Sequence, residues 1–287
     1  MSDTVTLSRP KAPEAFSSIS RLDALTWALP LVPRDRRAAA RALLAFRDEV
    51  HSIADGTAPR PEKRGRLTAW RLELDALEAG LPATPLTLAL HPAYKRFRLP
   101  RTELENLILA ADMDAGGVMV APPLCDLRLY CRRSTGALMV LFSAILGDTG
   151  RPAGCFSLAL GEAMRMTTLL RDLEAAVRAG RLCLPREILA EAGIVVASTT
   201  EVLDHASLPA ACEPMAAMAA DRFQDARALM PEVAPVARPF LSAVLTAHEA
   251  LLGALMKRGW QSLTPPPLPS SMALAARVLR HRLRGPA

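Results

Sequence analysis

The chain has 287 residues, of which 51% are hydrophobic and 4% aromatic, and it carries a formal net charge of +6. Abundant Ala and Leu, with no run of alternating β-branched residues, favour an all-α fold with one large core and argue against a sheet protein. The positive charge suits phosphates, diphosphates or an anionic membrane surface, whereas no nucleic-acid-binding motif or aromatic-interleaved basic stripe is found.

Neither a membrane span nor a secretion signal is apparent. The longest apolar run, residues 136–147, is shorter than the roughly 18–20 residues that cross a bilayer, and residues 1–16 lack the apolar core of a signal peptide. The five cysteines show no CxxC spacing and are odd in number, which favours reduced, mostly buried thiols over a metal site. We therefore expect a cytoplasmic protein, with membrane association left open.

Helix signals follow one another along the chain. A loose arm is expected over residues 1–17, a long helix from near Pro33 to about Asp55, and a loop over residues 56–65 because of their Gly, Pro and charge content. Apolar spacing and turn residues predict further helices at about 66–79, 86–97, 101–114, 124–147, 156–179, 185–192, 208–229 and 235–258.

These helices are expected to form one domain over residues 18–262. Residues 263–287 are predicted to form a Pro-rich linker and a last amphipathic helix over about 271–284. One side of this helix carries the basic residues Arg277, Arg280, His281 and Arg284. Such a helix can lie on an anionic membrane surface or pack its apolar side on the domain.

The most informative segment is residues 160–189, LGEAMRMTTLLRDLEAAVRAGRLCLPREIL. It resembles the second signature of the squalene/phytoene synthases, which is close to LGxAxQLTNILRDxxEDxxxGRxYLPxE. Residues 45–55 are similar to the first signature, close to AFxREVDDIAD, and residues 129–131 match the LYC that opens the central helix. Residues 97–100, 113–114 and 258–260 look like landmarks of one subgroup, the presqualene diphosphate synthases of bacterial hopanoid pathways.

The resemblance implies an all-α isoprenoid synthase-type bundle around a central cavity. Enzymes of that subgroup condense two farnesyl diphosphates head to head, using Mg²⁺ to neutralise the departing diphosphate. Carried over residue by residue, it implies a catalytic role for Tyr130, in steering the carbocation or in proton transfer, although a core tyrosine is an equal alternative. It also implies metal binding by Asp55 and Asp172, and substrate binding by the following residues: Arg165, Thr168, Arg171 and Arg181.

The acidic motifs are degenerate. Carboxylates four residues apart share one helix face and can reach one ion cluster. The family pattern has six such positions, and here four of them hold other residues: His51, Ser52, Ala175 and Ala176. Asp48, two turns before Asp55, is the one plausible stand-in. His51 can be a metal ligand, but a lone histidine in place of an acid is more often structural.

Arg165 stands where the family pattern has Gln, on one helical stripe with Thr168, Asp172 and Ala176. A buried cation needs an anion. Three alternatives follow: an ion pair with Asp172 or Asp55 that closes the site, direct contact with a diphosphate, or rotation to solvent.

The sequence therefore predicts a prenyltransferase by ancestry, in isoprenoid and hopanoid or squalene biosynthesis, with impaired or lost catalysis. Mg²⁺ is the cofactor if the protein is active, and none is needed otherwise. The alternative is a pseudoenzyme that binds a prenyl lipid or acts as an assembly or regulatory partner, for example of a paralogous synthase. In either case Asp55 and Asp172 are expected to face one cavity.

Overall fold

The structure, a computed structural model, describes residues 24–196 and 198–266. In these ranges the only β-structure is one isolated bridge, between Val120 and Leu182. The helices are α2 (Ala24–Ala28), η2 (Leu29–Leu31), η3 (Arg34–Arg36), α3 (Arg37–Asp55), α4 (Arg60–Ala79), α5 (Pro85–Phe97), α6 (Arg101–Ala115), α7 (Leu124–Cys131), the π-helical η4 (Arg132–Gly136), α8 (Ala137–Ile145), α9 (Arg151–Arg171), α10 (Leu173–Arg178), α11 (Arg186–Glu191), η5 (Thr200–Asp204), α12 (Leu208–Leu229), η6 (Met230–Glu232) and α13 (Arg238–Arg258). The all-α prediction is confirmed, while the expected N-terminal arm and C-terminal helix lie outside the described residues.

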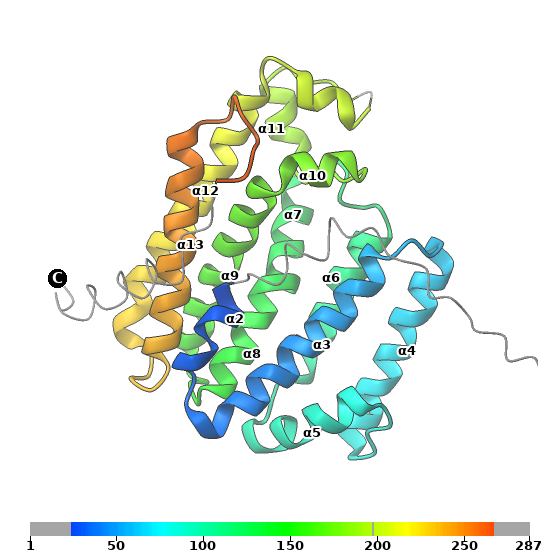
Figure 1. Ribbon diagram of the computed structural model, residues 1–287, viewed down its shortest axis with the longest axis vertical. Helices are drawn as coiled ribbons and strands as arrows, with labels where there is room; N and C mark the ends of the chain where they lie inside the picture. Colours follow the sequence, from blue (N-terminus) through cyan, green and yellow to red (C-terminus); the bar gives the residue numbers. More distant parts are fainter. Residues whose placement is uncertain (1–23, 197, 267–287) are drawn as a thin grey trace, which may run out of the picture.

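Helix α9 lies at the centre of the fold (Figure 1). It contacts α8, η4 and α12, and α12 in turn packs on α13. Helices α3 and α6 contact each other beside this centre, and α4 and α13 lie at opposite edges of the view. The rings of Phe142 on α8 and Phe240 on α13 stack with centroids 5.0 Å apart, so aromatic packing joins the central helices to the outer pair.

Helix α13 is long and apolar enough to cross a membrane by length and composition. However, 56% of its most apolar window is buried inside the fold, where the helix contacts α2, α9 and α12. Buried residues such as Phe240, Val244 and Leu251 form its inner face. We therefore interpret α13 as a core helix.

Two predicted helices are interrupted. The helix expected over residues 124–147 contains the π-helical segment η4, and the helix expected over 156–179 begins at Arg151 and breaks at Asp172. The π segment lies where α9 crosses most closely: a Cβ on Gly161 would be 2.5 Å from the Gly136 Cα. Position 161 therefore needs glycine for α9 to approach η4 this closely, whereas a Cβ on Gly136 would meet no atom closer than 3.3 Å.

The predicted loop over residues 56–65 was too long, because α4 already begins at Arg60. Pro61 occupies its first turn, where the missing backbone N–H costs no helical hydrogen bond, and Lys63 donates its backbone N–H to the Pro59 carbonyl at 3.1 Å. The prolines that were read as loop residues therefore begin a helix.

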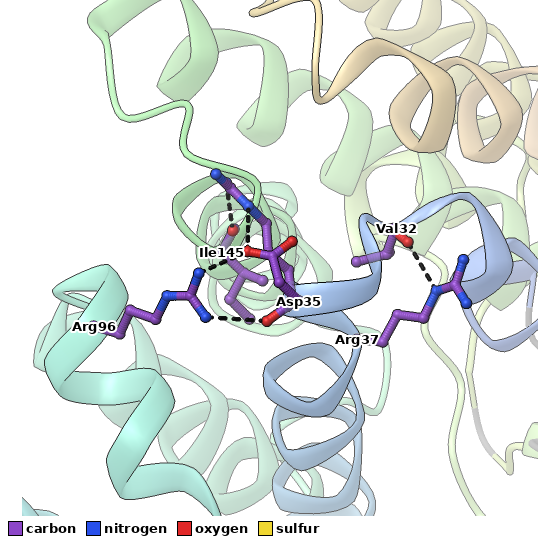
Figure 2. A network of polar contacts seen from close by, with 6 residues as sticks. Val32, Asp35, Arg37, Arg96 and Ile145 are labelled. Atoms are coloured by element: carbon purple, nitrogen blue, oxygen red, sulfur yellow. Dashed lines mark hydrogen bonds and ion pairs between the residues drawn. The ribbon is translucent and has the colours of Figure 1, made fainter.

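The N-terminal end of α3 is tied to α5 and α8 by arginine side chains (Figure 2). Arg36 donates a hydrogen bond to the Ile145 carbonyl at 3.0 Å, at the end of α8. Arg96 on α5 forms an ion pair with Asp35 at 2.6 Å. These contacts fix the direction of α3, whose opposite end carries the candidate site.

Candidate functional site

A cavity of about 110 Å³ lies where α3, α6 and α9 end. This volume is below the roughly 300–1,000 Å³ of pockets that enclose drug-sized ligands, so the cavity suits a compact charged group. The residues that line it are His51, Asp55, Asp114, Tyr130, Arg165, Thr168, Leu169, Asp172, Ala176, Arg181 and Cys183.

Four of these residues form the stripe expected from helical periodicity. Arg165, Thr168, Asp172 and Ala176 all line the cavity, although the helix is interrupted at Asp172. The interruption is a single residue, and the Ala176 N–H still donates to the Asp172 carbonyl at 2.9 Å. The backbone therefore keeps its direction closely enough for α10 to continue the same face.

The remaining lining residues come from elements far apart in the sequence. His51 and Asp55 are on the last two turns of α3, Asp114 is near the end of α6, and Tyr130 is on α7. The bridge between Val120 and Leu182 holds the segment after α10 and brings Arg181 to the cavity. Asp55 and Asp172 thus share one cavity, as the sequence predicts.

Arg165, Tyr130 and Asp114 form a hydrogen-bonded chain. The Arg165 guanidinium donates to the Tyr130 hydroxyl, which donates in turn to the Asp114 carboxylate at 2.8 Å. The guanidinium carbon also lies 4.7 Å from the centroid of the fully buried Tyr130 ring, in cation–π contact. The position of Tyr130 is therefore fixed by groups from α6 and α9.

The two surviving carboxylates of the motifs are both engaged by arginines. Asp55 accepts from Arg181 at 2.8 Å, and Asp172 forms a two-pronged ion pair with Arg171 at 2.6 and 2.7 Å. Arg171 itself does not line the cavity. Of the three alternatives for Arg165, the ion pair with Asp172 or Asp55 is not formed, because those carboxylates are paired elsewhere and Arg165 binds Tyr130.

Burial changes the protonation of several groups. It raises the pKa of Asp114 to about 6, against the opposing effect of Arg165 and Arg181. It lowers the pKa of His51 to about 3, helped by the positive charge of Arg165, so His51 is neutral at pH 7. Burial also raises the pKa of Cys183 to about 12, which keeps this thiol protonated.

The donor set does not fit a cluster of divalent ions. Asp48 is 60% exposed, pairs with Arg47 and lies outside the lining. Ser52 donates its hydroxyl to the Glu49 carbonyl at 2.7 Å and also lies outside it, as does Ala175. Within residues 24–196 and 198–266, no three His, Cys, Asp or Glu side chains converge as a metal site would require.

The sequence reasoning did not select Asp114 or Cys183 as lining residues with a part in the site. Asp114 had been noted only within residues 113–114, as a landmark of the subgroup, and Cys183 only as one of five cysteines expected to be mostly buried thiols. The available signal for Asp114 was its place at the end of an amphipathic helix, where a carboxylate that is partly buried needs a donor.

Comparisons with known proteins agree with the all-α fold. A family profile described as squalene/phytoene synthase matches residues 24–283. The chain is 30% identical to the presqualene diphosphate synthase of Rhodopseudomonas palustris over 76% of its length and 78% of that protein, and 28% identical to that of Sinorhizobium fredii over 88% and 90%. A dehydrosqualene synthase crystallised with a ligand superposes with a TM-score of 0.80 at 19% identity, covering 94% of this chain and 95% of that one. The chain belongs to the squalene/phytoene synthase family.

Proposed function

We propose that this protein binds a prenyl diphosphate in the cavity between α3 and α9 but has impaired or lost the head-to-head condensation of farnesyl diphosphate. The family consists of prenyltransferases that generally depend on Mg²⁺, and the relatives named above are presqualene diphosphate synthases. The observation that carries the proposal is the state of the two surviving motif carboxylates, Asp55 and Asp172. Each is held in an ion pair by an arginine of this chain.

Ionisation of an allylic diphosphate requires its developing negative charge to be neutralised. Mg²⁺ would supply that neutralisation when held by several carboxylates. In this chain the donors are too few, and a carboxylate already bonded to a guanidinium would have to give up that pair to bind an ion. Tyr130 and Arg181 still line the cavity. The cavity therefore keeps side chains that can contact a prenyl diphosphate, although most of the metal ligands are lost.

The proposal places the protein in isoprenoid metabolism, in the cytoplasm or at a membrane surface. A non-catalytic prenyl-lipid carrier and a regulatory partner of a paralogous synthase both fit such a site. The net charge of +6 is compatible with peripheral contact to anionic lipid.

Restoration of the motifs tests the proposal. The variant combines His51→Asp, Ser52→Asp, Arg165→Gln, Thr168→Asn, Ala175→Glu and Ala176→Asp. With farnesyl diphosphate and Mg²⁺, we expect the variant to form a head-to-head product, detected by mass spectrometry, and the unaltered chain to form little. Single reversions should change little, because residues that build one ion site act as a unit. Efficient magnesium-dependent conversion by the unaltered chain would overturn the proposal.

A further inference from the structure

Arg165 is a partly enclosed cation without a carboxylate partner. Among the residues that the structure describes, no Asp or Glu oxygen lies within ion-pair distance of its guanidinium. Its hydrogen bond to Tyr130 uses one of the five N–H donors of an arginine. Its Nε is buried and has no hydrogen-bond partner. A buried donor left unsatisfied is costly, so the guanidinium of Arg165 keeps hydrogen-bonding capacity that the chain does not use.

The neighbouring acids cannot supply that acceptor. Asp55 and Asp172 are paired with Arg181 and Arg171. Asp114 reaches Arg165 only through the Tyr130 hydroxyl, and its own burial opposes its negative charge. Arg165 therefore has no anionic partner among the residues that the structure describes.

The changes in the motifs shift the charge of the cavity in the same direction. Compared with the family pattern, four acidic positions hold the neutral residues His51, Ser52, Ala175 and Ala176, and a neutral Gln is replaced by Arg165. Of these five positions, His51, Ala176 and Arg165 line the cavity, so relative to that pattern the lining is more positive by three charges. Asp55, Asp114 and Asp172 are the carboxylates that remain on the lining, and the first and last of them are paired with arginines.

We infer that the cavity binds the diphosphate group of an isoprenoid ligand directly on Arg165, without a divalent metal ion. This inference rests on the proposed function for the nature of the ligand. Arg165 lines a cavity of about 110 Å³, a size that suits a compact head group. Arg181, which also pairs with Asp55, is a second cation on the lining. Charge-assisted hydrogen bonds from guanidinium to phosphate oxygens are among the strongest that a side chain makes.

Isothermal titration calorimetry of the full-length protein tests this inference, with inorganic diphosphate and farnesyl diphosphate as probes. Each is titrated once in EDTA and once in Mg²⁺. We expect both probes to bind in EDTA, and Mg²⁺ to add no affinity. Arg165→Gln should weaken binding in EDTA about ten- to a hundredfold, the size expected for one charge-assisted hydrogen bond. Arg165→Lys, which keeps the charge, should retain part of the affinity.

Arg178→Gln is the matched control, because Arg178 lies on α10 near the site, is 67% exposed and pairs with Glu174. It should bind as the unaltered chain does. Thermal melts of all variants show whether each is folded, and Arg165→Lys keeps the comparison open if Arg165→Gln is not.

Binding of farnesyl diphosphate only in Mg²⁺ would overturn the inference while leaving the prenyl diphosphate site of the proposed function intact. Binding in EDTA that Arg165→Gln leaves unchanged would also overturn it. No binding of farnesyl diphosphate under either condition would instead refute the proposed function itself.

Discussion

Replacement of Asp114 by Asn is expected to stabilise the folded protein at neutral pH. Asn keeps an oxygen that can accept the hydrogen bond from Tyr130 but carries no charge to bury. Burial raises the pKa of Asp114 from 3.8 to about 6. Because the folded state holds this proton more tightly than the unfolded state, ionised Asp114 lowers stability as the pH rises between these values. At 1.36 kcal/mol per pKa unit, the full cost at pH 7.5 is at most about 3 kcal/mol, and solvent screening at this partly enclosed residue reduces it.

Urea denaturation followed by circular dichroism at pH 5.0 and pH 7.5 measures this effect. About half of the cost, up to roughly 1.4 kcal/mol, should develop between these two pH values. The free energy of unfolding of the unaltered chain should therefore fall relative to that of Asp114→Asn as the pH rises. Asp221→Asn, at an exposed position of α12, is the control for loss of a carboxylate. If Asp114→Asn were less stable than the unaltered chain by the same amount at both pH values, the burial argument would be refuted.

Two further predictions concern packing. Gly161→Ala should lower the free energy of unfolding, measured by urea denaturation, by about 1–3 kcal/mol, because the added Cβ would overlap the Gly136 backbone. The control Gly154→Ala, on the same helix, places its Cβ more than 4 Å from any neighbouring atom and should be neutral or stabilising. In a thiol titration with Ellman's reagent at pH 8, the exposed Cys125 and Cys155 should react quickly, and the three buried cysteines should react only when the protein unfolds. Rapid reaction of more than two thiols in the folded protein would contradict the burial of the other three.

The helices were predictable from the sequence because apolar residues recur at spacings of three and four and prolines mark their starts. The interruptions were not. Residues 168–176 contain neither Gly nor Pro, so nothing local signals the break at Asp172. The π-helical segment lies where Gly136 meets Gly161, a contact between two helices that no single helix pattern reveals.

The sequence predicted which residues face the cavity, but not which of them form hydrogen bonds and ion pairs with one another. Helical periodicity correctly placed Arg165 and Asp172 on one face. It could not show that Tyr130 from α7 would come within hydrogen-bond distance of Arg165. Nor could it show that Arg171, the next residue in sequence, would bind the Asp172 carboxylate. Partner choice depends on distances between helices, which one-dimensional spacing does not contain.

The central claim is that arginines of this chain, rather than metal ions, neutralise a diphosphate in the cavity. Equilibrium dialysis of the purified protein against Mg²⁺ and an unreactive thiolo analogue of farnesyl diphosphate tests it directly, with magnesium measured by atomic absorption on both sides of the membrane. We predict that the protein side retains up to one analogue per chain and no excess magnesium. An excess of one or more magnesium ions per chain, abolished by combining Asp55→Asn with Asp172→Asn, would contradict the account.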